Sequence, residues 1–493
     1  MGRMQLQTGT TLDGFVIGKK IHQGGMAEIW EVTKDGIEAP LVMKIPLILD
    51  GDDPTMIVGF EQEQMILPRL AGPHVPKIYG LGDFSIQPYI VMERIDGESL
   101  LKRFKEAPIP LAEVIDLGAK IATALASLHA QDVIHLDLKP SNIMFRPTKA
   151  FSAKVDPGFA PENASERHGG EAVFIDFGLS RHLKLPDLLA EEFRVPMGTA
   201  PYIAPEQVLK LREEPRSDQF ALGVLLYTLA TGERPFGNPK HTTKALIRRL
   251  YEAPTPPRLI RKDIPDYLQE IILRCLDVKP ERRYPTARQL AFELRHPEQV
   301  TLTDRATREK THWLKNMLAG RLNPYDKAPL SRLESYRHAS TAPIMMVAVD
   351  LSSEGVPLAE ALRDLVSRLL VTSPDSRLAC VNVLKTARVG LDTLMEDDGT
   401  SIHVKRLVEL KNWAAEMRLP PERITFHVLE SPDPAEALLT FARNNHVDHL
   451  LVGARGSGGV RRYLGSVSTA VVAEAACTVT VVRKQAAEDE AEA

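Results

Sequence analysis

The chain has 493 residues, enough for two or three domains rather than a single hydrophobic core. Hydrophobic residues make up 44% of it and charged residues 26%, and the formal net charge is -4, a balance that favours neither nucleic acid nor a membrane surface as the main partner. The three cysteines, Cys275, Cys380 and Cys477, lie far apart, which argues against a zinc site or a disulfide framework. No stretch is apolar and long enough to span a bilayer, and the first residues lack the apolar run of a signal peptide, so we expect a cytoplasmic protein.

Two apolar stretches near the start, residues 15–17 and 29–32, predict strands that flank the turn Gln23-Gly24-Gly25-Met26-Ala27. A glycine turn between strands lets backbone N–H groups approach phosphates, because no Cβ stands in the way. Taken alone, the turn is equally compatible with an ordinary hairpin.

The stretch 41–45 predicts a strand with a single lysine, Lys44, inside it. Such a lysine either protects an edge strand from aggregation or faces a cleft as a phosphate-holding ammonium group. The second role requires a carboxylate that positions the ammonium group. The helical run 60–67 offers Glu63 for this, with Glu61 as the alternative that would be a solvated helix charge.

Residues 88–97 predict a strand that ends in a turn. Residues 111–131 carry apolar side chains at helical spacing and predict a core helix, which leads to the motif His135-Leu136-Asp137-Leu138-Lys139-Pro140-Ser141-Asn142. A second motif, Asp176-Phe177-Gly178, follows the apolar run 172–175. Together the motifs hold carboxylates, an amide and a lysine, which are the groups that phosphoryl transfer needs to orient a hydroxyl, hold Mg²⁺ and offset charge.

The two motifs in this order resemble the catalytic loop and the metal-binding loop of protein kinases. The resemblance covers residues 13–297 and implies an α+β two-lobed protein-kinase fold, with an N-lobe at about 13–95 and a C-lobe at about 96–297. It implies a Ser/Thr protein kinase that transfers the γ-phosphoryl group of ATP to Ser/Thr hydroxyls of protein substrates, with Mg²⁺ or Mn²⁺ as the metal. Lys139 followed by Pro140 is similar to Ser/Thr rather than Tyr kinases.

The resemblance also implies roles for individual residues. The implied catalytic residues are Asp137, Lys139, Lys44 and Glu63, and the implied metal ligands are Asn142 and Asp176. The other implied nucleotide-binding residues are Ile21, Gly24, Gly25, Ile29, Val42, Met92, Glu93 and Ile95. Among these, the backbone of Glu93 and Ile95 would contact the adenine edge.

The glycine turn departs from the three-glycine pattern of kinases, because His22 and Ala27 stand at two of the glycine positions. This departure favours the alternative of a pseudokinase, a nucleotide-sensing scaffold that transfers no phosphate. Retention of the implied phosphate, metal and hydroxyl-orienting residues argues against it, since a scaffold has no chemical need for all of them. A small-molecule kinase is a third reading, which the segment Ala204-Pro205-Glu206 disfavours.

Residues 181–198 contain no Ser, Thr or Tyr, and Leu136 stands where many kinases have the arginine that receives a loop phosphate. The acceptor and its receptor are missing together. We therefore predict that activity does not depend on phosphorylation of this segment, and that the apolar residues Leu188, Leu189 and Phe193 order it instead.

Three further residues of the second lobe are expected to have structural roles by resemblance. Asp218 would brace the backbone of the catalytic loop, and Glu206 would form a buried ion pair with Arg283.

Residues 154–171, rich in proline, glycine and charge, predict a polar surface insertion.

Residues 298–341 are polar and predict a linker that carries a helix. From 342 to 484 short apolar strands alternate with amphipathic helices, which predicts an α/β domain with a five-stranded parallel sheet. The acidic stretch 485–493 predicts a disordered tail. The predicted strands are 344–349, 378–383, 424–428, 449–452 and 479–482, and the predicted helices are 358–370, 404–417, 435–444 and 467–475.

Asp350 follows the first of these strands, Gly453 and Gly456 follow the fourth, and Gly465-Ser466 opens a helix. Loops at the carboxyl ends of parallel strands that lead into a helix are where such sheets hold phosphates. The arrangement resembles the universal stress protein domain, and this implies a second ATP or AMP bound by these five residues. The alternative is a domain that binds no nucleotide and only dimerises, which would make the protein a homodimer.

Overall fold

The computed structural model describes ten stretches of the chain, and the fold is given for these: residues 7–24, 27–47, 54–147, 170–193, 195–237, 246–309, 343–352, 355–386, 401–454 and 465–483. The predicted site residues Gly25 and Gly456 lie outside the described residues, as do the predicted tail and the linker from residue 310 onward.

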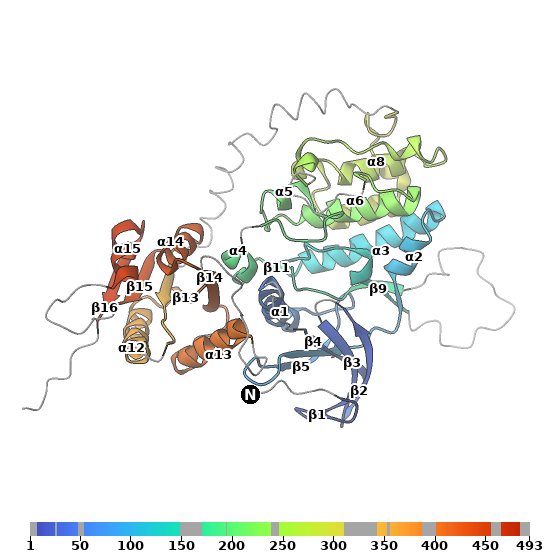
Figure 1. Ribbon diagram of the computed structural model, residues 1–493. Coiled ribbons are helices and arrows are strands. Elements are labelled where there is room, and N and C mark those ends of the chain that lie inside the picture. Colours follow the sequence, from blue (N-terminus) through green and yellow to red (C-terminus); the bar gives the residue numbers. More distant parts are fainter. Residues whose placement is uncertain are drawn as a thin grey trace, which may run out of the picture.

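Within the described residues, the first lobe holds a six-stranded antiparallel sheet, in the order β1-β2-β3-β4-β6-β5, and the helix α1 (Figure 1). Along β4, Leu41, Met43 and Ile45 are buried in a core on one face of the sheet. Because side chains alternate along a strand, Lys44 projects from the opposite face. The elements are β1 (Thr11–Leu12), β2 (Phe15–Gln23), β3 (Ala27–Lys34), β4 (Ile37–Pro46), α1 (Thr55–Ile66), β5 (Ile78–Gly82) and β6 (Tyr89–Glu93).

The second lobe is helical, with short strands where it meets the first. Its central helix α6 (Arg216–Thr231) is buried along nearly its whole length, and α3 (Leu111–His129) packs against it. The other helices are α2 (Leu100–Lys105), α4 (Leu188–Glu192), α5 (Pro205–Val208), α8 (Asp266–Cys275) and α9 (Ala287–Arg295), and the strands are β7 (Glu98–Ser99), β8 (Val133–Ile134), β9 (Ile143–Pro147), β10 (Gly170–Phe174) and β11 (Arg181–His182).

The base of the second lobe contains the expected ion pair of Glu206 with Arg283. Both side chains are buried, and the guanidinium group donates to the two carboxylate oxygens at 2.6 and 2.9 Å. Ser217 adds a hydrogen bond to Glu206 at 2.6 Å. The predicted pair is confirmed, and its bidentate geometry with added hydrogen bonds is what a buried pair needs to offset its desolvation.

The second lobe extends past the predicted boundary at residue 297. The backbone N–H of Thr303 donates to Glu270 of α8 at 3.0 Å, and Arg305 pairs with Asp277 at 2.9 Å. The predicted linker therefore begins with residues that belong to this lobe. The end of the predicted insertion, residues 154–171, is also revised. Its residue Gly170 belongs to strand β10 and pairs with Pro147 of β9.

The C-terminal domain has a five-stranded sheet in the order β14-β13-β12-β15-β16, and every described strand pair is parallel. Helices α12 and α13 cover one face and α14 and α15 the other. The elements are β12 (Ile344–Ala348), α12 (Val356–Thr372), β13 (Arg377–Lys385), α13 (Ile402–Ala414), β14 (Ile424–Ser431), α14 (Pro434–Asn444), β15 (His449–Gly453), α15 (Ser466–Glu474) and β16 (Thr478–Val482). The predicted fold, two lobes followed by a five-stranded parallel α/β domain, is confirmed.

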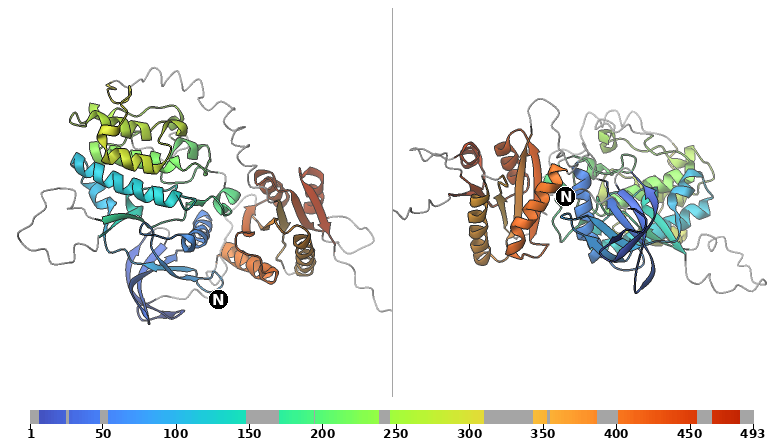
Figure 2. Two further views of the ribbon diagram at one scale, coloured as in Figure 1. Left: turned by 180° about the vertical axis from the view of Figure 1, so that it is seen from behind. Right: turned by 60° about the horizontal axis from the view of Figure 1, so that its bottom comes forward.

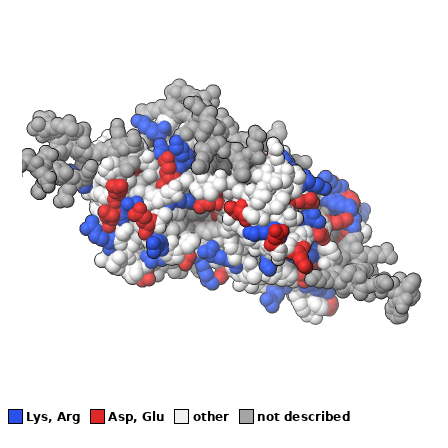
Figure 3. Space-filling view, turned by 90° about the horizontal axis from the view of Figure 1, so that it is seen from below, with Lys and Arg blue, Asp and Glu red and all other residues white. Residues whose placement is uncertain are grey.

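The C-terminal domain lies beside α1 and α4, on one side of the two lobes (Figures 1 and 2). On the face seen in Figure 3, basic and acidic side chains are interspersed rather than gathered by sign. In the part of the chain that the structure describes, no helix has both the length and the apolar content to cross a membrane.

Candidate active site

Lys44 lies between the carboxylates of Glu63 and Asp176. Its Nζ is 2.6 Å from Oε2 of Glu63 and 3.1 Å from Oδ1 of Asp176. Burial alone would lower the pKa of Lys44, but Asp176 and Glu63 raise it above its usual value, so the ammonium group is charged. Burial raises the pKa of Glu63, against the opposing effect of Lys44. The structure thus brings Glu63, and not the alternative Glu61, to this lysine.

Asp137 lies in the loop after β8 and is buried by its hydrogen-bond partners. Lys139 Nζ is 2.6 Å from its Oδ2, and the Asn142 side-chain amide donates to its backbone oxygen at 3.1 Å. Thr199 donates to Oδ1 twice, from its backbone N–H at 2.8 Å and from its hydroxyl at 2.7 Å. Both carboxylate oxygens of Asp137 are therefore held by hydrogen-bond donors.

The backbone of this loop is strained and braced. Leu136 has φ +61°, a left-handed conformation that costs a non-glycine residue about 1–2 kcal/mol. Asp218 accepts hydrogen bonds from the backbone N–H groups of His135 and Leu136, both at 2.9 Å, and a third contact joins it to His129 at 2.8 Å. The expected brace by Asp218 is therefore present, and it holds the strained residue directly before Asp137.

Asp176 points into the space between the lobes because the next residue, Phe177, is fully buried. The Phe177 ring lies 5.4 Å from the His135 ring, centroid to centroid, and burial lowers the pKa of that histidine. Burial alone would raise the pKa of Asp176, but the ammonium groups of Lys44 and Lys139 lower it to about 2. Asp176 is therefore an anion at neutral pH.

The oxygens of Asn142 and Asp176 fit a divalent metal. Ile175 N–H donates to the backbone oxygen of Asn142 at 3.1 Å, which keeps the two residues close. Oδ2 of Asp176 has no hydrogen-bond partner among the described residues, while its Oδ1 is held by Lys44 and Gly178. Mg²⁺ prefers one or two protein oxygens together with phosphate oxygens and water, and this donor set matches that preference.

The predicted nucleotide-binding residues of the first lobe line the same side of the sheet or its end. Met92 is buried, Val42 and Ile29 are partly buried, and Ile21 is exposed. Gly24 follows β2, and its N–H donates to the backbone oxygen of Ala27 in β3 at 3.0 Å.

Strand β6, which contains Met92 and ends at Glu93, leads into the connection between the lobes. The Glu93 carboxylate forms a bidentate pair with Arg146 of β9. The N–H of Ile95 donates to no group within the described residues, so it is available to a ligand. The ion pair of Glu93 with Arg146 uses side chains only, so it anchors the connection to the second lobe and leaves the N–H of Ile95 free of it.

In the C-terminal domain, the described candidates gather at the carboxyl edge of the sheet. Asp350 follows β12 and accepts from Ser352 N–H at 3.0 Å, and Gly453 ends the neighbouring strand β15. Gly465 is the N-cap of α15, and Ser466 is its first residue. A Cβ at Gly453 would lie 2.3 Å from the side chain of Leu358, so a larger residue there would displace this leucine of α12.

Sequence reasoning missed two residues that shape this site. Thr199 binds Asp137, and its signal in the sequence is that it is the first hydroxyl after the hydroxyl-free residues 181–198. Arg146 gave no local signal, because its partner Glu93 lies 53 residues away in the chain.

The two-lobed fold and the charged cluster between its lobes define the class of protein kinases. Residues 15–297, more than half of the chain, match the family model described as protein kinase domain, so the chain belongs to the protein kinase family. Residues 343–483 match the model of the universal stress protein family. ATP and a divalent metal ion are the cofactors of the kinase family, and proteins are its substrates.

Similar proteins include bacterial kinases. A probable serine/threonine-protein kinase of Clostridium acetobutylicum is 29% identical over 288 residues, covering 58% of this chain and 40% of the relative. Serine/threonine-protein kinase PknA of Mycobacterium tuberculosis is 29% identical over 290 residues, covering 57% and 61%. The chain thus spans between two fifths and three fifths of these relatives. The crystal structure of the Mycobacterium tuberculosis PknI kinase domain is 21% identical, with a TM-score of 0.42, and covers 59% of this chain and 99% of that one.

Proposed function

We propose that the chain is a Ser/Thr protein kinase that transfers the γ-phosphoryl group of ATP to hydroxyls of protein substrates. The observation that carries the proposal is the convergence of Lys44, Glu63 and Asp176 in one chain of ion pairs. Asp137 and Lys139 form a second charged pair, bound to Asn142, at the same boundary between the lobes. Residues so distant in the sequence meet here in an arrangement that serves phosphoryl transfer.

Asp137 orients the substrate hydroxyl and accepts its proton. Its carboxylate is held by Thr199 on one oxygen and by Lys139 on the other, so it is already positioned when a hydroxyl arrives, and little reorganisation is needed. Lys139 also places positive charge beside the carboxylate, where the transferring group gains negative charge. Lys44, positioned by Glu63, holds nucleotide phosphates.

Mg²⁺ is the metal that the oxygen donors of Asn142 and Asp176 would hold, and Mn²⁺ has similar requirements. When bound, it would neutralise charge on the phosphates. The ionised Asp176 contributes the negative charge of the site, and Lys44 keeps Oδ1 of that carboxylate in place. Ile95 N–H and the Glu93 backbone would bind the adenine edge, with Met92 and Val42 beside the ring.

The test is transfer of labelled phosphate from ATP, with Mg²⁺, to the chain itself and to a generic protein substrate. We expect incorporation on Ser and Thr, identified by mass spectrometry. The competing proposal, a pseudokinase scaffold, is favoured by the altered glycine turn, in which Gly24 N–H is already bonded to Ala27. Nucleotide binding without any transfer would support the scaffold and contradict the kinase.

We further propose a cytoplasmic protein whose C-terminal domain binds a second ATP or AMP and forms a homodimer, and so regulates the kinase. Asp350, Gly453 and the N-terminus of α15 gather at the sheet edge where phosphates are held in such folds. Strand β16 forms one edge of the sheet among the described strands, which is a surface that a second copy could extend.

We expect two nucleotides per chain in equilibrium dialysis with ATP, one for each domain. The variant Asp350→Ala should bind one nucleotide per chain. If the wild type also binds a single nucleotide, and substitution of Lys44 alone abolishes that binding, then the C-terminal domain binds no nucleotide. Sedimentation of the same samples reports whether the chain dimerises.

A further inference from the structure

The C-terminal domain lies directly against two helices of the kinase lobes, α1 and α4, as Figures 1 and 2 show from different directions. Val404 and Leu407 of α13 belong to the same buried apolar cluster as Ile57 and Phe60 of α1. Strand β14, at the edge of the sheet, packs against α4. An edge strand and an amphipathic helix of one domain are thus covered by the other domain.

The end of α4 is bound by three polar residues of the C-terminal domain. Arg377 Nη1 lies 2.6 Å from Oε1 of Glu191. The buried ring of His427 in β14 lies between two carboxylates, 2.9 Å from Glu191 and 3.0 Å from Glu192. Asn445 donates to the backbone oxygen of Glu191 at 3.2 Å. Glu191, through a carboxylate oxygen and its backbone oxygen, and Glu192, through a carboxylate oxygen, are therefore bound by the other domain.

The charges in this cluster depend on one another. Burial alone would lower the pKa of His427, but Glu191 and Glu192 raise it to about 9, so the ring is protonated at neutral pH. Burial alone would raise the pKa of Glu191, but Arg377 and His427 lower it to about 2. Two cations thus face two carboxyl groups, and loss of one partner would leave a buried charge unpaired, which is strongly destabilising.

On its other side, α4 is bound to the kinase lobes. Leu188 N–H donates to the side chain of Gln62 in α1 at 3.1 Å, and Leu188 and Leu189 share a buried cluster with Val58. Arg212 binds Asp187, the N-cap of α4, at 2.7 Å.

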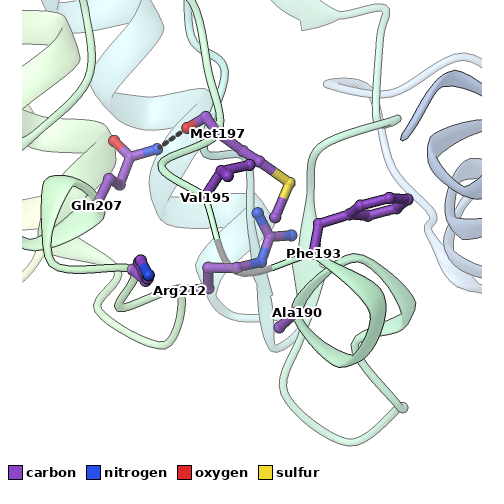
Figure 4. Close-up of a pocket in the computed structure, with 7 residues that line it drawn as sticks. Ala190, Phe193, Val195, Met197, Gln207 and Arg212 are labelled. Carbon is purple, nitrogen blue, oxygen red and sulfur yellow. Dashed lines mark hydrogen bonds between the residues drawn. The ribbon is translucent and has the colours of Figure 1, made fainter. Parts of the chain in front are cut away.

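Figure 4 shows Arg212 standing in the hollow beside α4. The hollow, lined by Phe193, Val195 and Met197 among others, takes nothing larger than a water molecule. Leu188 and Leu189 are buried against Val58 of α1, and Phe193 packs against the same cluster, as the predicted ordering of this segment by these three residues requires. The C-terminal domain adds its own contacts to α4.

Helix α1 contacts both the C-terminal domain and the ion pairs of Lys44. Glu61 forms an ion pair with Lys411 of α13, and Glu63, two residues later, holds Lys44. At Gly59, an added Cβ would lie 3.0 Å from the backbone oxygen of Gly178. Because α1 touches the loop after Asp176 this closely, a displacement of α1 would move both carboxylates that hold Lys44.

The two hydroxyls that flank residues 181–198 are already engaged. Ser180 is fully buried and donates to His135 O at 3.1 Å, and Thr199 binds Asp137. Neither is placed to carry a phosphate, and Leu136 could not bind one. The ordering that a phosphate supplies in other switches must come from contacts in this chain.

We propose that the C-terminal domain is a built-in activator: by docking β14 and α13 onto α4 and α1, it holds Lys44, Glu63 and Asp176 together in place of a phosphate on the segment that contains α4. This inference rests on the proposed kinase function. By linkage, the free energy with which docking favours the assembled ion pairs equals the free energy with which the assembled ion pairs favour docking.

The test uses the full chain with substitutions at the two contact points. Lys411→Glu and Arg377→Ala should each lower the rate of phosphoryl transfer by about 5- to 150-fold, the usual range of coupling between sites. Adding Glu61→Lys to Lys411→Glu restores the ion pair with its charges exchanged and should recover most of the rate. Arg368→Glu, on the exposed side of α12, is the matched control and should leave the rate unchanged.

Thermal melting checks that each variant is folded. If Lys411→Glu is unfolded, the rate of Arg377→Ala tests the proposal. Wild-type or higher rates in both folded variants would overturn the proposal, as would a charge exchange that restores nothing. Phosphatase treatment of the wild type should not change its rate; a loss of activity traced to a phosphate in residues 180–199 would also overturn it.

Hydrogen exchange separates this proposal from the proposed function. In Lys411→Glu, the amides of residues 55–66 and 188–192 should exchange faster than in the wild type, whether or not the chain transfers phosphate. A wild type that transfers nothing contradicts the kinase function alone. Unchanged protection of both helices in the variant contradicts the docking proposal alone.

Discussion

Replacing Asp137 with asparagine should lower kcat for phosphoryl transfer by about 10²- to 10⁴-fold, the usual contribution of a positioned general base. The amide oxygen can still accept both hydrogen bonds from Thr199, so the loop keeps its shape. What is lost is the ability to accept the hydroxyl proton, together with the hydrogen bond that Lys139 donates to the other oxygen. The KM for ATP should stay nearly constant, because Asp137 is assigned to the hydroxyl and not to the nucleotide.

The matched control is Asp132→Asn, the same substitution five positions earlier. Asp132 is half-exposed, pairs with Lys184 at the surface, and has φ +60°, a conformation that asparagine also tolerates. Exposed pairs contribute about 0–1 kcal/mol, so rate and stability should hardly change. A wild-type rate from folded Asp137→Asn would contradict the role given to this carboxylate.

The parts of the site that could be predicted are those in which chemistry and local pattern coincide. Lys44 stands alone in an apolar strand, and the alternation of that strand decides which face it occupies. Asp137 and Asp176 each follow a buried strand, where a carboxylate has no structural reason to be. In the C-terminal domain, short β-branched runs alternate with amphipathic stretches, so strands and helices could be placed to within a few residues.

The contacts between the domains could not be predicted, because no local pattern marks them. Glu191 and Arg377 are 186 residues apart, and Lys411 and Glu61 are 350 apart. Each side chain, read in its own element, is indistinguishable from a charge facing solvent. His427 lies in an apolar strand, where it would ordinarily be a core histidine rather than a bridge between two carboxylates.

The hydroxyl-free segment connects these two kinds of result. Its composition indicated that phosphorylation is not the switch, but not what replaces it. The structure places α4 between α1 and the C-terminal domain, and the proposed activation by docking gives the missing phosphate and the added domain one physical explanation. In the proposed activation, apolar contacts and the charge cluster of Glu191, Glu192, Arg377 and His427 would supply this order.

Replacing Asp176 with asparagine should lower the rate by at least about 10²-fold, since it removes the anion that faces the metal and the transferring phosphates. With a pKa of about 2, Asp176 is fully ionised at neutral pH, and no change of pH in that range can restore the lost charge in the variant. The concentration of Mg²⁺ needed for half-maximal rate should rise. Lys44 keeps Glu63 as its partner at 2.6 Å, so the thermal stability should fall little.

The Mg²⁺ dependence of Asp176→Asn is compared with that of Glu63→Gln. Both substitutions take one carboxylate from Lys44, but Glu63 is buried behind the lysine and has no access to a metal. Its loss should slow transfer by loosening Lys44, with the Mg²⁺ requirement unchanged. If the two variants show the same metal dependence, Asp176 acts only as a second anchor for Lys44, and the metal must be held elsewhere. If only Asp176→Asn requires more Mg²⁺, the two carboxylates have different roles, as their exposure suggests. Glu63 then positions the ammonium group of Lys44, and Asp176 binds the metal ion.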